Sequence, residues 1–590
     1  MANRLLRPFR DFSLTSYTKD EAALANPARL GADAAVFLAV ALLIFGIYRL
    51  TNQIDAPIQD IATPATFDTN PALLPYYAAR SLLRMFAALI LSTIFTFVYA
   101  TVAAKSRRAE KVLIPLLDIL QSVPVLGFLS VTLTMWLALF PGSEIGVELA
   151  AIFAIFTSQV WNMTFAFYQA QVTEPKELDE AARAMRLTRW QRFWQLDAPS
   201  GVMPLVWNGM MSFGGGWFFL IASEVISVNN AEYALPGIGS YVAAVTENQQ
   251  LGRLMLAIAV MVLMVVGVNF LFWRPLTAWA EKFRLGDSSA VTQQRSYVLD
   301  LIRHSRIPAF IGKVTHPLGE WLNKATRPLG SGAPALVVDV RRRRAGDVVF
   351  TVIVGALIVW GTVVMLLYLH RTVGLGEFVH AILLGLATFA RVMAMLVIAT
   401  LIFVPLGVWI GLNPKVTRIM QPVVQVLASF PANFLFPFVT MFLLWSHISL
   451  NIGGVFLMAL GAQWYILFNV MAGAAAIPND LREVATNLRM PLLQRWKDIY
   501  GPAIFASWVT GGITAAGGAW NASIVAEVVS YGGTNLTATG LGAYITQATT
   551  EGNFAKTFIG VIVMAVFVVG LNRVLWKPLN KLAERRYSYV

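Results

Sequence analysis

The sequence predicts an all-α integral membrane protein made of two tandem six-helix units, with about twelve transmembrane helices in all. The first observation is composition: of 590 residues, 57% are hydrophobic and only 13% are charged, and the mean hydropathy is +0.63. A soluble protein of this length needs far more charge to cover its surface. The second observation is a repeat, since residues 177–199 recur in altered form at residues 480–502.

Twelve apolar stretches are long enough to cross a bilayer, which takes about 20 helical residues. In the first half we expect spans at 32–50, 79–103, 112–139, 147–169, 203–228 and 254–274. In the second half we expect spans at 347–369, 378–411, 420–445, 451–474, 503–530 and 557–577. Because six spans per unit is an even number, both units enter the membrane with the same polarity. This parallel repeat predicts a pseudo-two-fold axis along the membrane normal.

The loops predict the orientation of the chain. Arg4, Arg7 and Arg10 precede the first expected span, whereas the connection 51–78 carries three aspartates and no Lys or Arg. The positive-inside rule therefore places both termini and both copies of the repeated stretch in the cytoplasm. The net charge of +13 could also suit a nucleic acid, but the basic residues lie between and beside apolar stretches, so we expect no nucleic-acid partner.

This pattern divides the chain into four parts. A cytoplasmic amino-terminal segment (1–31) precedes the first unit (32–284), and a basic cytoplasmic linker (285–346) leads to the second unit (347–590). Arg341–Arg344 at the end of the linker is typical of a topology anchor that faces anionic lipid.

The repeated stretch is polar, unlike its surroundings. It reads ELDEAARAMRLTRWQRFWQLDAP in the first half and DLREVATNLRMPLLQRWKDIYGP in the second. A charged, helix-prone segment that lies between two apolar spans and occurs twice is most simply a docking element for a partner outside the membrane.

The motifs in this stretch resemble a known family. Glu180-Ala181-Ala182 followed by Leu196-x-Ala198-Pro199 fits the cytoplasmic signature of bacterial ABC importer permeases, which is Glu-Ala-Ala, three residues, Gly, nine residues and Ile-x-Leu-Pro. The second copy, with Glu483-Val484-Ala485, is looser. The later stretch Ala222-Ser223-Glu224-Val225-Ile226 and its counterpart near Glu527 look like the nitrate/sulfonate/taurine branch of that family.

The resemblance implies two fused permease units that form the translocation pathway of an ATP-driven importer in the bacterial inner membrane. It implies a small anionic or zwitterionic solute such as nitrate, sulfonate, taurine or bicarbonate, two ABC ATPase subunits and an external solute-binding protein. The stretches 177–199 and 480–502 would be the coupling helices. The candidate coupling residues are Glu180, Ala181, Ala182, Arg186, Arg192, Glu483, Ala485, Arg489 and Arg495.

These coupling residues have simpler interpretations as well. Glu180 and Glu483 suit the positive ends of their helices and could act as caps, and the arginines could form a solvated basic face. The signature glycine is replaced by Arg186 and Arg489. Because arginine adopts positive φ only at a cost, we expect the loop to be a continuous helix or to bend elsewhere.

The sequence contains no recognisable motif for nucleotide binding, catalysis or metal binding. It lacks a Gly-x-x-x-x-Gly-Lys-Ser/Thr loop, so we expect ATP and Mg to be bound by partner subunits and this chain to be no enzyme and to hold no cofactor. Its five histidines are scattered and it has no cysteine, so we expect no catalytic triad and no metal site.

Ionisable residues inside spans are costly and usually have a partner or face a cavity. We hypothesise that Arg84 pairs with Glu224 and Arg391 with Glu527, either to hold an external gate or to offer positive charge to an anion. The alternative is a fixed buried pair without a role in transport.

Other residues in the spans could line a central path or serve only packing. The candidates for the path are Asn208, Trp217, Trp520 and Asn521, each of which could instead contact only neighbouring helices. The glycine clusters 214–216 and 517–518 permit close helix approach or local unwinding. Ser122-Val-Pro124 and Ser429-Phe-Pro431 predict helix breaks, because proline removes a backbone donor.

Two other classes of function stay open. A secondary transporter with parallel repeats would need no docking helix, and its uptake would persist without ATP. A membrane scaffold that transports nothing would show no solute-dependent stimulation of a partner ATPase.

Overall fold

The computed structural model describes residues 27–51, 63–122, 129–185, 187–228, 231–283, 296–305, 316–317, 319–326 and 340–586. Several expectations lie outside these residues: most of the amino-terminal segment and of the linker, the break at Ser122-Val-Pro124, and Arg186. The described chain is helical apart from short connections and two β-hairpins, as the sequence predicts for an all-α fold.

The first unit begins with the apolar helix α3, and the short helix α14 (Tyr297–His304) that follows the unit belongs to the linker. The main helices of the unit are α3 (Pro27–Thr51), α4 (Leu74–Lys105), α5 (Arg107–Ser122), α6 (Leu129–Leu139), α7 (Glu144–Val172), α8 (Lys176–Ala184), α9 (Arg189–Arg192), α10 (Ala198–Glu224), α11 (Ile238–Glu247), α12 (Leu251–Val268) and α13 (Arg274–Ala280).

The second unit repeats this order. Its main helices are α16 (Val340–Thr372), α17 (Leu375–Gly411), α18 (Pro414–Ser429), α19 (Phe436–Ser446), α20 (Leu450–Ala475), α21 (Asn479–Asn487), α22 (Leu492–Arg495), α23 (Gly501–Ala526), α24 (Leu541–Thr550), α25 (Phe554–Leu571) and α26 (Lys577–Arg586). The repeat extends to short π-helical turns, which precede α10 and α23 at Phe193–Asp197 and Trp496–Tyr500.

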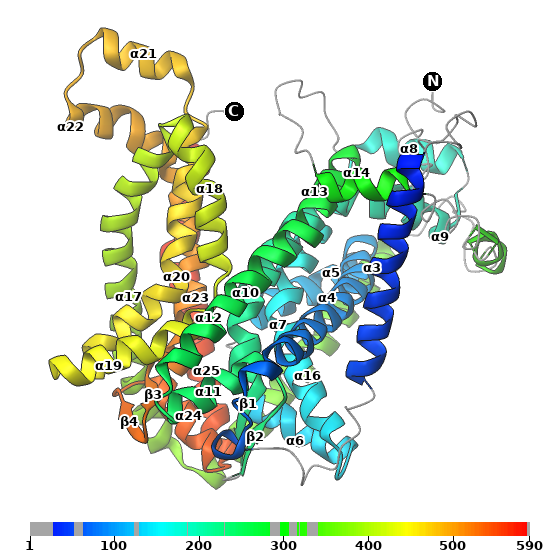
Figure 1. Ribbon diagram of the computed structural model, residues 1–590. Helices are drawn as coiled ribbons and strands as arrows, with labels where there is room; N and C mark the ends of the chain where they lie inside the picture. The colour runs from blue at the N-terminus through cyan, green and yellow to red at the C-terminus, as the bar shows by residue number, and fades with distance from the viewer. Residues whose placement is uncertain are drawn as a thin grey trace.

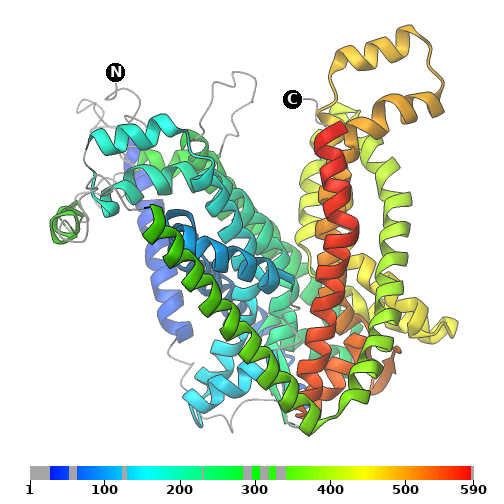
Figure 2. The ribbon, with the colours of Figure 1, turned by 180° about the vertical axis from the view of Figure 1, so that it is seen from behind.

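The two units stand side by side and approach each other most closely at one end (Figure 1). At that end lie the hairpins and the short helices α11 and α24, and toward the opposite end the units diverge (Figures 1 and 2). Within each unit, the central helix packs against two others: α7 against α4 and α10, and α20 against α17 and α23. The two docking elements predicted from the repeat, α8–α9 and α21–α22, lie at the same, diverging end of the molecule.

By length and composition, eight helices of the described chain could cross a membrane, or nine if α18 and α19 form one span. The axes of these two helices meet at 84°, and the break falls at Ser429-Phe-Pro431 as predicted. The other three predicted spans are also helical, as α3, the α5–α6 pair and α23. Helix α23 is rich in Gly and Thr, several of which line a cavity between the units.

The predicted fifth spans of both units, 203–228 and 503–530, are wrong at their ends. Helix α10 ends at Glu224, and the next residues form strand β1 (Val225–Val228), which pairs antiparallel with β2 (Ala231–Ala234). In the second unit β3 (Val528–Tyr531) pairs with β4 (Thr534–Thr537). The β-branched residues that made these ends look like membrane helix also favour strands. The hairpin is followed by α11 or α24, neither of which we predicted.

Candidate functional site

Glu527 is a buried carboxylate in the second unit, at the end of the molecule where the two units approach each other most closely. It is 0% exposed, lies at the carboxyl end of α23 and forms a 2.6 Å ion pair with Arg391 of α17. It also accepts hydrogen bonds from the Thr388 hydroxyl (2.7 Å) and from the backbone N–H groups of Gly542 (2.7 Å) and Ala543 (3.1 Å). The carboxylate therefore satisfies orphan donors in the first turn of α24 and ties three helices together.

Glu224 does the same in the first unit. It is 0% exposed and accepts from Arg84 (2.6 Å), from the Ser81 hydroxyl (2.6 Å) and from the backbone N–H of Gly239 (2.6 Å) at the start of α11. The predicted pairing of each arginine with the glutamate of its own unit is thus present. Both carboxylate oxygens of each glutamate accept hydrogen bonds from nearby donors. This geometry favours a fixed structural pair.

The same carboxylates explain the Gly-x-Gly sequence that follows each hairpin. A Cβ on Gly237 would collide with the Glu224 carboxylate, and a Cβ on Gly540 would collide with that of Glu527. Both glycines have extended backbone, with φ of −174° and −171°, so their role is space for the carboxylate. Glycine is common at positions where another group lies so close to the backbone that a Cβ would not fit.

In the first unit the pair belongs to a larger network that sequence reasoning missed. Glu148 of α7 bridges two arginines of α4: Arg84 donates to it at 2.6 and 2.7 Å, and Arg80 also donates to it. Arg80 donates to Glu144 as well, at 3.2 Å. A signal was available, because Arg80/Arg84 on the span predicted at 79–103 and Glu144/Glu148 around the start of the span predicted at 147–169 are each spaced i, i+4, which puts each pair on one helix face.

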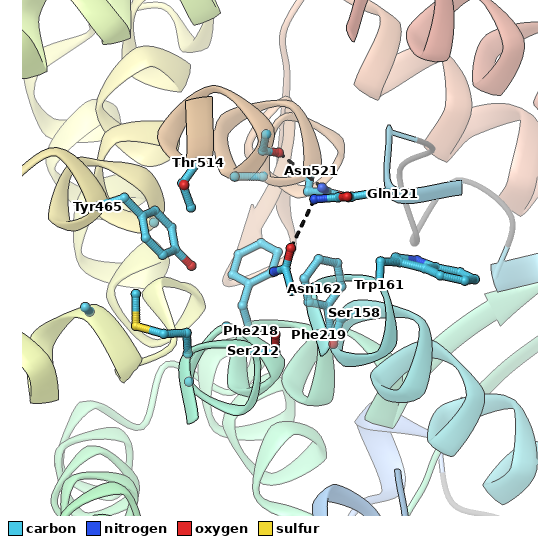
Figure 3. A pocket seen from close by; sticks show the side chains of 18 of the residues that line it. Gln121, Ser158, Trp161, Asn162, Ser212, Phe218, Phe219, Tyr465, Thr514 and Asn521 are labelled. Carbon is cyan, nitrogen blue, oxygen red and sulfur yellow. Dashed lines mark hydrogen bonds between the residues drawn. The ribbon is translucent and has the colours of Figure 1, made fainter. Parts of the chain in front are cut away.

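A second candidate site is a cavity of about 390 Å³ between the units, lined by α7 and α10 on one side and α20 and α23 on the other. Figure 3 shows its polar side chains, which converge from both units. Asn208 and Asn521 line it, as the sequence suggested. Each donates its amide N–H to a carbonyl four residues earlier, Pro204 or Gly517. No Asp, Glu, Lys, Arg or His is among its described lining residues.

The two tryptophans proposed for this path are not part of the cavity lining. Trp217 and Trp520 are each 1% exposed. Trp217 packs edge-on against Phe213, and Trp520 stacks on Phe567. The structure therefore places both away from the wall of this cavity, although Trp217 lines a separate pocket of about 20 Å³ together with Gln425 and Ser429 of α18. Gly214, Gly215, Gly517 and Gly518 do line the cavity, within continuous helices.

The third candidate site is the pair of loops at the diverging end. In the first loop Ala182 is buried with Leu178 and Leu196, whereas Glu180 is exposed. Arg192 makes its ion pairs within the loop. It forms ion pairs with Glu174 (3.4 Å), with Asp179 and with Asp197 (3.3 Å), which closes the loop on itself.

These contacts lower the pKa of one carboxyl group in the first loop, that of Asp179. Burial alone would raise the pKa of Asp179, but the hydrogen bond and charge of Arg192, with the charge of Arg183, outweigh burial and lower it. Arg192 is thereby a structural member of the loop.

In the second loop the signature-glycine position keeps the glycine conformation. Arg489 has φ of +51°, in the left-handed region, and the chain turns there between α21 and α22. The expectation of a continuous helix or a bend elsewhere is therefore wrong for this copy. Because the Met490 N–H bonds to the Ala485 carbonyl (3.0 Å), the turn satisfies helix-end groups and offsets the strain.

The remaining candidates of the second loop divide by exposure. Glu483 is exposed and Ala485 is buried at 1%. Arg495 donates to the Met490 carbonyl at 2.9 Å and so supports the same turn. Large apolar side chains project from this loop, with Leu488, Leu492 and Leu493 exposed by 70, 72 and 84%. The described residues contain no group of three or more His, Asp or Glu arranged to hold a metal ion.

Comparison with known proteins bears directly on this doubled architecture. The family model described as "Binding-protein-dependent transport system inner membrane component" matches residues 94–274 and again 403–576, together more than half of the chain. The chain belongs to this family. Each match includes one of the loops and one of the buried glutamates, and it begins inside α4 in the first unit and inside α17 in the second.

Relatives of this inner membrane component include two kinds of permease. The bicarbonate transport system permease protein CmpB of Synechococcus elongatus is 28% identical over 191 residues, which are 31% of this chain and 62% of that protein. The nitrate import permease protein NrtB of Leptolyngbya laminosa is 27% identical over 191 residues, covering 31 and 61%. The NrtB of Synechocystis is 27% identical over 197 residues, covering 32 and 64%. The chain thus spans somewhat over three-fifths of the length of these relatives.

Proposed function

We propose that this chain forms the translocation pathway of an ATP-driven importer for a small anion or zwitterion. The observation that carries the proposal is the placement of two equivalent loops, α8–α9 and α21–α22, at one end of a molecule whose two units share a central cavity. The family, and relatives named as nitrate and bicarbonate permeases, support it.

In this proposal the two loops are docking sites for separate ATPase subunits in the cytoplasm. Large exposed apolar side chains that are rimmed by polar residues mark protein contacts. Leu492 and Leu493 meet that description in the second loop, next to the exposed Glu483 and Arg489. Closure of two ATPases around ATP would bring the loops together and move the two units about their contacts at the opposite end.

The uncharged cavity would hold the solute between the units. Its volume of about 390 Å³ suits a small solute, and its polar side chains are hydroxyls and amides. Nitrate, bicarbonate, taurine and other sulfonates are the proposed solutes, delivered by a solute-binding protein at the end where α11 and α24 lie. The cell membrane location and the cytoplasmic placement of both termini belong to this proposal.

The docking step is tested by co-purification of the chain with ABC ATPase subunits expressed from the same genome. Leu493→Glu places a charge in the exposed apolar surface of the second loop and should reduce recovered ATPase by at least tenfold. The matched control is Tyr297→Glu, because Tyr297 is 81% exposed on α14 in the linker and lies outside both loops. Equal recovery with both variants would contradict docking on this surface.

The transport step is tested in vesicles that contain the chain with its ATPase and are loaded with ATP. Uptake of labelled nitrate, bicarbonate or taurine should require ATP and persist after ionophores collapse all ion gradients. Uptake that follows an ion gradient without ATP would instead identify a secondary transporter.

A further inference from the structure

The central cavity differs between its two sides at one repeated position. Trp161 and Trp464 are equivalent in the repeat, and the next residues are Asn162 in the first unit and Tyr465 in the second. Both line the cavity and point toward one another across it (Figure 3). The fusion of two units has thus allowed an amide and a phenol to face each other where identical subunits would place the same residue twice.

Tyr465 reaches from one unit to the other. Its ring lies over Gly518 of its own unit, where a Cβ would stand 3.4 Å from the ring edge. Its hydroxyl lies beside Gly215 of the first unit, where a Cβ would stand 3.4 Å from the oxygen. The phenol is therefore the side chain that spans the cavity between α23 and α10, and glycine on both helices gives it room.

Two hydroxyls in this cavity lack a partner within the part of the chain that the structure describes. The Ser212 hydroxyl of the first unit is buried, with the residue 4% exposed, and makes no hydrogen bond. The Tyr465 hydroxyl likewise has no hydrogen bond to a described residue. By contrast, Thr510 and Thr514 donate to carbonyls of their own helix at 3.0 Å.

An unpartnered buried hydroxyl such as that of Ser212 costs about 1–3 kcal/mol, so it is normally satisfied by water or a ligand. The hydroxyl of the half-buried Tyr465 is open to the same partners. The amide of Asn162 adds to the donors: its oxygen already accepts from Gln121 at 3.0 Å, so its N–H₂ is the part left to offer a solute. Since no side chain that is ionised at neutral pH lines the cavity, neutral donors are what it offers to the oxygen atoms of a solute.

We propose that Tyr465 and Ser212 bind the oxygen atoms of the transported solute, and that Tyr465 is a specificity-determining residue contributed by the second unit alone. The inference rests on the proposed function and deepens it: the solute is a small oxyanion, or a zwitterion with an oxyanion group, recognised by hydroxyl and amide donors.

The test uses the chain with its ATPase and binding protein in vesicles, with nitrate, bicarbonate and taurine as probes. Tyr465→Phe removes one oxygen and keeps the ring, and Ser212→Ala removes the other hydroxyl. Each should raise the half-saturating concentration of the transported probe about tenfold while the maximal rate changes less than twofold, because a hydrogen bond to a charged group is lost. The matched controls are Tyr368→Phe at an exposed position and Ser446→Ala at a half-buried position, both outside the cavity lining.

A second measurement exploits the absence of cysteine in the chain. Thr514→Cys places a single thiol in the exposed part of the cavity lining, and Asn487→Cys places one on the exposed face of α21. The transported probe should slow thiol labelling at position 514 at least threefold and leave position 487 unchanged. With Tyr465→Phe, this protection should need about tenfold more probe.

The outcomes separate the two levels of the proposal. If the wild-type complex accumulates none of the three probes with ATP, the proposed function fails and the inference falls with it. If the wild type transports a probe but Tyr465→Phe and Ser212→Ala leave its half-saturating concentration unchanged, the inference alone is overturned. A loss of maximal rate at unchanged half-saturation, or no protection at position 514, also overturns the inference.

Discussion

The two units bury the same glutamate in different electrostatic surroundings. In the first unit Glu224 and Arg84 are linked to three more ionisable groups, Arg80, Glu144 and Glu148. In the second unit Ala387 and Asn451 stand at the positions equivalent to Arg80 and Glu148. His447, which aligns with Glu144 in sequence, lies outside α20 as the C-cap of α19, and Arg391 completes its bonds with neutral acceptors. These are the Asn451 side chain (2.9 Å), the Asn451 carbonyl (3.0 Å) and the Thr539 carbonyl (2.6 Å).

The difference separates what the fold requires from what one unit has added. The glutamate, its arginine, a hydroxyl from Ser81 or Thr388, and the following Gly-x-Gly are shared, and together they attach a short helix to the bundle. The ion network around Arg80 is an addition in the first unit. A buried network is stable only when all its members are satisfied, so the first unit should be the more sensitive to the loss of a single charge.

The largest expected effect comes from Arg84→Gln. This change leaves Glu148 and Glu224 short of a cation in a buried site, which costs about 3–5 kcal/mol. Arg391→Gln should cost less, because it leaves one carboxylate that three neutral donors, the Thr388 hydroxyl and the backbone N–H groups of Gly542 and Ala543, can largely satisfy. Thermal unfolding in detergent, followed by size-exclusion chromatography, measures both, with the partly exposed Arg253→Gln as control. Equal losses for Arg84→Gln and Arg391→Gln would show that the network adds nothing.

The next effect should be equal in the two units. Gly237→Ala and Gly540→Ala each push a methyl group into a glutamate carboxylate. Overpacking of this kind costs about 1–3 kcal/mol. Gly252→Ala near the start of α12 is the control, because a Cβ there meets nothing within 4 Å. A clear difference between positions 237 and 540 would mean that the shared carboxylate cradle is not the common element.

A smaller effect distinguishes the two loops. Arg192→Ala removes one cation from three carboxylates, whereas Arg495→Ala removes one bond to a backbone carbonyl. We expect the first change to destabilise its loop by about 1–2 kcal/mol after allowance for solvent screening, and the second by less. Hydrogen exchange over 174–199 and 478–502 measures the loss of protection in each variant. A larger increase in exchange with Arg495→Ala than with Arg192→Ala would contradict this prediction.

The smallest effect is a gain. Arg489→Gly should stabilise the second loop by about 1 kcal/mol, because glycine adopts the left-handed backbone of this position without a Cβ penalty. Asn487→Gly, two residues earlier inside α21, should instead weaken the helix by up to about 1 kcal/mol. The same exchange experiment compares them. A loss of protection with Arg489→Gly would mean that the arginine side chain itself holds the turn.

Much of this architecture was predictable from local patterns. The length of the apolar stretches gave most helices, Pro431 gave the bend between α18 and α19, and the recurrence of 177–199 gave the duplication. The pairing of Arg84 with Glu224 was also predictable, because both are ionisable groups at matching depths in spans of one unit, although the other charges of the network were missed. The hairpins were missed, because β-branched residues at a helix end fit either a span or a strand.

The sequence by itself determined the class of the protein, its doubling and the residues that carry charge into the bilayer, because these follow from composition and spacing along one chain. Only the tertiary structure decided how each polar group is used. Arg192 closes its own loop, Trp217 fills a core, and Tyr465 crosses to the other unit. Such roles depend on distances between segments that are hundreds of residues apart, and a linear pattern does not contain those distances.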